Sequence, residues 1–107
     1  MKIKNWNIEE LTGYKPLTTL YMDFSIADKF GKNAILSTFN AAKKEYKGRY
    51  KYQTELAMVL NWKLWEHYDN NDDELTQIYN KLFTSYNDYL LDNLKGEELS
   101  YYIRTTD

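Results

Sequence analysis

The stretch from Lys51 to Asp69, KYQTELAMVLNWKLWEHYD, constrains the fold more than any other part of the chain. At 100° per residue its main apolar residues fall on one broad side of a helix, and these are Tyr52, Leu56, Val59, Leu60 and Leu64. Met58, Trp62 and Trp65 form a second apolar stripe on the opposite side. A helix that is apolar on two sides needs neighbours on both. We therefore predict a central helix at residues 51–68 that other helices cover, or whose far side meets another molecule.

The composition favours an all-α fold. Four Gly and one Pro leave little turn material for a many-stranded sheet, and 107 residues are enough for one domain with its own core. We expect a single domain over residues 1–107, a compact bundle of four to five helices around the central one. Eleven Tyr help to raise the aromatic content to 17%. Because a tyrosine ring can pack while its hydroxyl reaches water, these residues suit either the boundary of a core or a contact surface.

Capping residues and glycines mark the first part of the chain. Asn7 with Glu10 forms a capping-box pattern, which predicts a short helix ending at Gly13. The residue before a proline is pushed out of the helical region, so residues 14–16 should form a connector.

The next two predicted helices meet near Gly31. Thr18 or Thr19 can cap the first of them. Helical spacing predicts its inward face to be Leu20, Phe24, Ala27 and Phe30. The second helix should cover residues 33–48, with an inward stripe of Ile35, Leu36, Phe39, Ala42 and Tyr46.

After the central helix, Asn71 with Glu74 is predicted to cap a helix that ends near Gly96. Its apolar stripe is the most regular in the chain and consists of Leu75, Ile78, Tyr79, Leu82, Phe83, Tyr86, Tyr89 and Leu90. The tail at residues 96–107 fits either one more helical turn or an extended segment.

Charge is divided unevenly along the chain, although the net charge is only −2. Residues 25–51 hold seven Lys or Arg against two acids, whereas residues 52–107 hold eleven acids against four bases. Such a division can produce internal ion pairs or two faces of opposite sign.

Several classes of protein are disfavoured by what the sequence lacks. There is no cysteine, which rules out disulfides and thiolate metal sites and is compatible with a reducing compartment. No apolar run approaches about 18 residues, and the chain does not open with a charged region followed by an apolar one. We expect a cytoplasmic protein with no membrane partner.

Within residues 25–51, the segment from Ser25 to Gly31 reads like the first helix and turn of a DNA-binding helix-turn-helix. Ala27 and Gly31 have the spacing that this motif uses for its helix crossing and its turn. The second half departs, because polar residues stand where the motif has buried aliphatic ones. The basic residues that can contact phosphates are Lys32, Lys43, Lys44, Lys47, Arg49 and Lys51. An ordinary corner between two helices explains the same pattern, so nucleic-acid binding is an alternative hypothesis.

No set of residues predicts catalysis, a metal or a cofactor. His67 is the only histidine, which excludes a histidine metal cluster and leaves one residue for any catalytic triad. The segment after Asp69 begins like a calcium loop, but Glu74 stands where Gly is needed and Asn80 where Glu is needed. We expect a protein that is not an enzyme and has no cofactor.

Met58, Trp62 and Trp65 are the best candidates for a functional surface. Exposed Trp and Met are enriched at protein contacts, and Trp recurs among the residues that dominate binding energy. We expect the protein to bind another protein through this stripe, as an inhibitor or adaptor. The same stripe can instead pack inside the domain, or pair with a second copy of the chain in a structural homo-oligomer.

Three phrases together, DFSIADKFG, TELAMVLNWKLWEHY and YYIRTTD, resemble those of short uncharacterised proteins carried by phages and other mobile elements of low-GC and gut bacteria. The resemblance covers most of the chain from Leu20 onward and carries no assigned activity or site. It implies an intracellular accessory protein made inside a bacterial host.

Overall fold

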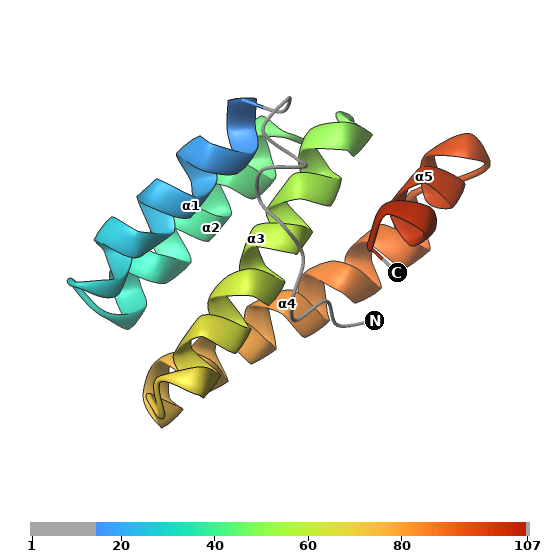
Figure 1. Ribbon diagram of the computed structural model, residues 1–107. Helices are drawn as coiled ribbons and strands as arrows, with labels where there is room; N and C mark the ends of the chain where they lie inside the picture. Colours follow the sequence, from blue (N-terminus) through green and yellow to red (C-terminus); the bar gives the residue numbers. More distant parts are fainter. Residues whose placement is uncertain (1–14, 107) are drawn as a thin grey trace.

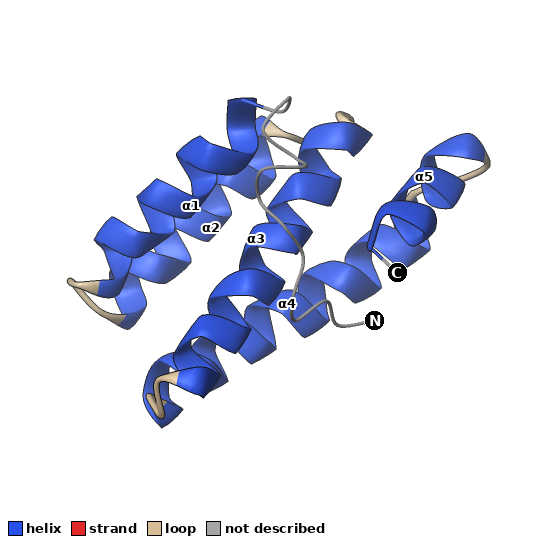
Figure 2. Cartoon of the chain, in the orientation of Figure 1, coloured by secondary structure: helices blue, strands red, loops and turns tan. Residues whose placement is uncertain are grey.

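The computed structural model describes residues 15–106, which form five helices and no strand (Figures 1 and 2). The helices are α1 Lys15–Asp28, α2 Lys32–Glu45, α3 Tyr50–Asp69, α4 Asp73–Asn93 and α5 Glu97–Thr106. The predicted all-α bundle of four to five helices is confirmed. The short helix predicted from Asn7 to Gly13 lies outside the described residues. None of the described helices is long and apolar enough to cross a membrane.

The central helix was predicted correctly, because α3 contacts each of the other four helices. Twelve of its twenty residues are buried. Leu56, Val59, Leu60 and Leu64 all belong to the core, and Tyr52 is half-buried against it. The apolar spacing of this stretch therefore places α3 in the middle of the domain, and the other helices are arranged around it.

The neighbours of α3 come from both ends of the chain. α1 and α2 run alongside each other as a helical hairpin on one side of α3, and α4 packs along another side (Figure 1). α5 reaches the first part of α3, where the rings of Tyr50 and Tyr101 meet edge to face with centroids 5.3 Å apart. One hydrophobic core joins these helices, from Leu20 in α1 to Tyr102 in α5.

α1 begins earlier than predicted. Lys15 and Pro16 belong to its first turn rather than to a connector, so neither Thr18 nor Thr19 precedes the helix as a cap. Proline has no N–H to leave unsatisfied in a first turn, and its fixed φ suits a helix there. Pro16 therefore starts this helix instead of separating two elements.

Phe30 was predicted to face the core, but its side chain is 76% exposed. α1 ends at Asp28, and the chain then turns at Gly31, which has φ 100°. Such a conformation is open to glycine and costly for other residues. Because the helix stops before Phe30, the helical spacing that places Leu20, Phe24 and Ala27 inside does not extend to it.

α4 begins one residue later than the predicted cap implies. Asn71 has φ 60° and belongs to the turn that follows α3. Asp72 is the cap instead, and its Oδ1 accepts a hydrogen bond from the backbone N–H of Leu75 at 3.1 Å. Asp73 and Glu74 then occupy the first turn, where the helix dipole favours acids.

The C-terminal tail is helical, which decides between the two forms predicted for it. α5 follows a turn at Gly96, which has φ 59°. Tyr102 is fully buried, and its hydroxyl donates a hydrogen bond to Asn87 Oδ1 of α4 at 2.5 Å. The buried tyrosine fixes α5 to the end of α4.

Shortening one buried side chain in the middle of α3 should show how much the stability of the core depends on this helix. Leu60→Ala is expected to lower the free energy of unfolding by about 2–5 kcal/mol, because it leaves a cavity where a fully buried side chain was. Leu91→Ala, on the exposed side of α4, should change it by less than about 1 kcal/mol. Chemical denaturation of both variants measures the difference, and equal losses would contradict the central position of α3.

Candidate functional site

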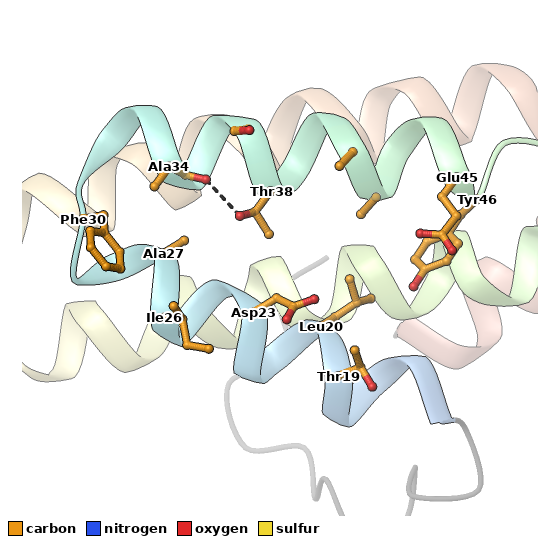
Figure 3. Close-up of a pocket in the computed structure, with 13 residues that line it drawn as sticks. Thr19, Leu20, Asp23, Ile26, Ala27, Phe30, Ala34, Thr38, Glu45 and Tyr46 are labelled. Atoms are coloured by element: carbon orange, nitrogen blue, oxygen red, sulfur yellow. Dashed lines mark hydrogen bonds between the residues drawn. The ribbon is translucent and has the colours of Figure 1, made fainter.

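A groove of about 570 Å³ separates α1 from α2 on the side away from α3. Its α2 edge consists of small side chains, which are Ala34, Ser37, Thr38 and Ala41. Phe30 lies at one end of the groove and Glu45 and Tyr46 at the other, with Asp23 between them (Figure 3). The groove is therefore shallow and open along α2, bounded by a large aromatic ring at one end and acidic further along.

An exposed apolar ridge, formed by Met22, Ile26 and Phe30, lies beside this groove, and Ile26 and Phe30 also line it. Their side chains are 57%, 54% and 76% exposed. Met22 and Ile26 are one helical turn apart on α1, and Phe30 belongs to the turn that follows the helix. The other large exposed apolar residues in residues 18–106 come one from each of three different helices: Tyr68, Leu91 and Ile103. An apolar row of this kind, beside a groove, is typical of a surface that binds another molecule.

The half of the groove away from Phe30 is acidic. Asp23 and Glu45 both line it, and both are exposed. Burial raises the pKa of Tyr46, and the carboxylates of Glu45, Glu55 and Asp23 raise it further, against a smaller opposing effect of Arg49. Of these carboxylates, Asp23 and Glu45 line the groove, so they place negative charge at this end of it.

The predicted stripe of Met58, Trp62 and Trp65 lies on one face of α3, but its members differ in exposure. Met58 is only 3% exposed, whereas the two tryptophans are half-buried. Trp62 stacks on Tyr21 of α1 with ring centroids 4.3 Å apart, and Trp65 meets Tyr68 edge to face at 5.3 Å. Both indoles thus make contacts within the domain, and a docking role for this stripe stays a prediction.

The predicted basic residues lie at different places on the molecule and differ in how far their side chains are exposed. Lys32 is at the start of α2, whereas Lys44, Lys47, Arg49 and Lys51 are exposed around the corner between α2 and α3. Three cations lie over aromatic rings: Lys43 is 4.6 Å from the centroid of Tyr89, Arg49 is 4.2 Å from that of Tyr52 and Lys51 is 5.8 Å from that of Tyr101. α1 and α2 run alongside each other, unlike the crossing helices of a helix-turn-helix (Figure 1).

A buried ion-pair network joins α1 to α3, and the sequence pattern did not predict it. The Lys63 side chain is 1% exposed, and its Nζ lies 2.8 Å from Asp28 Oδ2 and 2.7 Å from Glu66 Oε2. The same ammonium group donates a hydrogen bond to Ser25 Oγ at 3.1 Å. Tyr21 donates its hydroxyl hydrogen bond to the other oxygen of Glu66. A buried charge with this many partners is compensated rather than costly.

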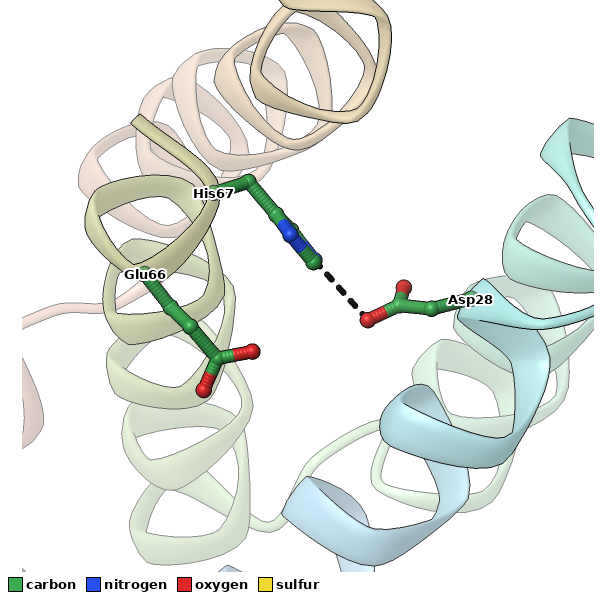
Figure 4. Close-up of side chains that lie close together, drawn as sticks. All are labelled: Asp28, Glu66 and His67. Atoms are coloured by element: carbon green, nitrogen blue, oxygen red, sulfur yellow. Dashed lines mark hydrogen bonds and ion pairs between the residues drawn. The ribbon is translucent and has the colours of Figure 1, made fainter. Parts of the chain in front are cut away.

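His67 and Tyr79 extend the network to α4. His67 Nε2 lies 2.8 Å from Asp28 Oδ2 (Figure 4). The Tyr79 hydroxyl donates a hydrogen bond to Asp28 Oδ1 at 2.5 Å. Burial by itself would raise the pKa of Asp28, but hydrogen bonds from His67, Lys63 and Tyr79 outweigh it and hold that pKa below its ordinary value. The pKa of Glu66 is lowered in the same way, since Lys63 and Tyr21 outweigh its burial.

Asp28, Glu66 and His67 place three ligand atoms within 4.8 Å of one another, which is the spacing of a metal site. Figure 4 shows Asp28 reaching from α1 toward Glu66 and His67 of α3. The ammonium group of Lys63, however, already contacts both carboxylates. This geometry favours an internal network that fixes α1, α3 and α4 to one another.

Glu55 is a second buried charge, without such compensation. Its side chain is on α3 and is 2% exposed, and neither carboxylate oxygen has a hydrogen-bond partner among the described residues. Burial raises its pKa to about 7. At neutral pH this carboxyl group is therefore divided between its protonated and ionised forms.

No protein-family model, curated protein or solved structure matches the chain.

Lys63→Ala should be strongly destabilising because it leaves Asp28 and Glu66 without their shared cation. The free energy of unfolding is expected to fall by about 3–5 kcal/mol at pH 7. The pKa values of Asp28 and Glu66 are lowered from their ordinary 3.8 and 4.5, so the network stabilises the wild type fully above pH 4.5. Its effect is lost as the pH falls through the lowered pKa values and the carboxylates protonate. Urea denaturation at several pH values tests this, with Lys44→Ala, an exposed lysine, as the matched control. A cost no larger than that of the control would contradict the network.

Glu55→Gln should change how stability depends on pH. The folded-state pKa of Glu55, about 7, exceeds the ordinary 4.5, so its stabilising effect is complete below pH 4.5 and is lost as pH rises through 7. One pKa unit corresponds to about 1.4 kcal/mol, so wild type should lose about 3 kcal/mol relative to the variant between pH 4.5 and pH 8. Glu97→Gln, at an exposed position, serves as the control. Parallel pH curves for wild type and Glu55→Gln would show that Glu55 ionises normally.

Proposed function

We propose that this protein acts by binding another protein, as a non-enzymatic inhibitor or adaptor. The observation that carries the proposal is the exposed ridge of Met22, Ile26 and Phe30 beside the groove between α1 and α2. Each of these side chains leaves more than half of its surface in water, although burying apolar area is the main favourable term in protein association. A partner that covers the ridge buries this apolar area, which favours association.

The surrounding geometry supports recognition of a folded element rather than chemistry on a small molecule. The groove is open along its length, and its polar members are two carboxylates and a few hydroxyls. The buried network around Lys63 contains charged hydrogen-bonding groups, but none of its members lines the groove. The charged side chains of this network thus stabilise the interior, whereas the groove presents a shaped and partly apolar surface to a partner.

The setting of this activity is part of the same proposal. The resemblance of three sequence phrases to phage and mobile-element proteins supports an accessory protein that works in the cytoplasm of a bacterial host. A host protein, or one encoded by the element, is then the expected partner.

A second candidate function is nucleic-acid binding, favoured by one observation. Lys44, Lys47, Arg49 and Lys51 are exposed around the corner between α2 and α3, where they can contact phosphates. Binding of this kind weakens steeply as salt rises. Gel-shift titration at several salt concentrations tests it, and absence of binding at low salt removes this candidate.

The protein-binding proposal is tested by removing the ridge without disturbing the core. Ile26→Ser with Phe30→Ser should abolish capture of a host protein in nuclease-treated lysate, because both side chains are exposed. The control is Leu91→Ser with Ile103→Ser, which removes exposed apolar surface from other helices. A helical spectrum and melting temperature close to those of wild type show that each variant is folded.

Two results would count against this proposal. Equal capture by the ridge variant and by wild type would show that the ridge is not the contact surface. Light scattering could instead show a molecular mass that rises with concentration in wild type but not in the ridge variant. That result would show that the ridge joins copies of the chain in a homo-oligomer.

A further inference from the structure

We propose that the groove between α1 and α2 receives an amphipathic helix of the partner protein, with a lysine or arginine of that helix lying over Asp23 and Glu45. This inference rests on the proposed protein-binding function and specifies the chemistry of the partner. It is drawn from the shape of the groove, the apolar residues on its α1 edge and the sign of its charges.

The shape of the groove suits a helix. Ala34, Thr38 and Ala41 follow one another on α2 at intervals of four and three residues, so they form one row along the helix. The Thr38 hydroxyl donates a hydrogen bond to the Ala34 carbonyl at 2.9 Å, which satisfies the hydroxyl within α2 (Figure 3). A row of small side chains lets the side-chain ridge of another helix enter closely.

The edge opposite α2 supplies apolar contacts. Ile26 of α1 and Phe30 of the turn after α1 both line the groove. Partners that place an amphipathic helix in a groove do so with apolar anchors at three- and four-residue spacing. A helix lying between the two edges would pack such anchors against Ile26 and Phe30 while its backbone approaches Ala34 and Ala41.

The charges that line the groove favour a partner with a positively charged side chain. Among the described residues two carboxylates line the groove, Asp23 and Glu45, and no lysine or arginine does. Neither acid forms an ion pair with another residue in the described part of the chain. A cationic side chain at this end of the partner helix is therefore favoured, whereas an acidic one is repelled.

The same charges argue against a second copy of this chain as the occupant. In a symmetric pair the same surface of each copy must meet its counterpart. Both surfaces would bring Asp23 and Glu45, and neither would bring a basic groove residue from the described part of the chain. A partner with a different sequence can supply the cation that a second copy lacks.

Selection from a display library of helical peptides tests the inference. The library consists of peptides about five turns long, randomised along one face and at both ends. Wild-type protein should enrich peptides with an apolar stripe and a lysine or arginine near one end. Ser37→Gln with Ala41→Gln fills the groove at two exposed positions and should abolish their binding. Asp23→Asn with Glu45→Gln keeps the shape and should weaken binding about three- to tenfold, with the preference for a cation lost.

The outcomes separate this inference from the proposed function. No enrichment over the filled-groove variant overturns the inference, while the function stands if ridge replacement still abolishes capture in lysate. Enriched peptides that bind the filled-groove variant equally, or that show no preference for a basic end, also overturn it. A wild-type dimer that the filled-groove variant dissociates would assign the groove to a second copy and contradict the charge argument. Melting temperatures near that of wild type confirm that both variants are folded.

Discussion

The constraint on which the structure depends is that α3 must be covered almost completely. Its apolar residues occur on two sides, and its buried residues include Gln53, Glu55, Lys63 and His67 as well as the aliphatic core. Enclosing such a helix takes polar groups into the interior along with apolar ones. The neighbouring helices must therefore provide hydrogen bonds and opposite charges in addition to packing surface.

Lys63 shows how this requirement is met. Its ammonium group is enclosed together with Asp28 of α1 and Glu66 of α3, and Tyr79 of α4 donates to the same aspartate. An ion pair of this kind contributes little net energy compared with apolar packing, but leaving it incomplete is expensive. It consequently specifies how α1 and α4 are placed against α3. Glu55 has no such partner among the described residues, so the stability of the fold should change with pH around neutrality.

The way α1 is used explains the candidate binding surface. Leu20, Phe24 and Ala27 bury one side of α1, and Asp28 anchors its end through the ion pairs. The opposite side carries part of the apolar ridge, and the small residues of α2 leave the groove beside it unfilled. The surface most suited to binding is thus set by two helix edges rather than by one sequence motif.

Local sequence patterns predicted the positions of the helices well but not the contacts between them. Spacing alone located α2, α3 and α4, because a helix repeats its buried positions regularly. The prediction for Phe30 was wrong because α1 stops two residues earlier. The cap was predicted at Asn71 but lies at Asp72, because Asn and Asp cap helices equally well and local sequence does not separate them. The network around Lys63 joins residues that are distant in sequence, so no local pattern reports it. The groove has the same origin, since α1 and α2 each contribute one edge.

Amide hydrogen exchange measured residue by residue tests the central position of α3 most directly. Amides in the middle of α3, around Leu56 and Leu60, should exchange only through global unfolding, with an opening free energy equal to that from denaturation. Those of α5, a short helix held mainly by Tyr102, should exchange through smaller openings. If the middle of α3 exchanges as readily as α5, the helix is not the element around which this domain is built.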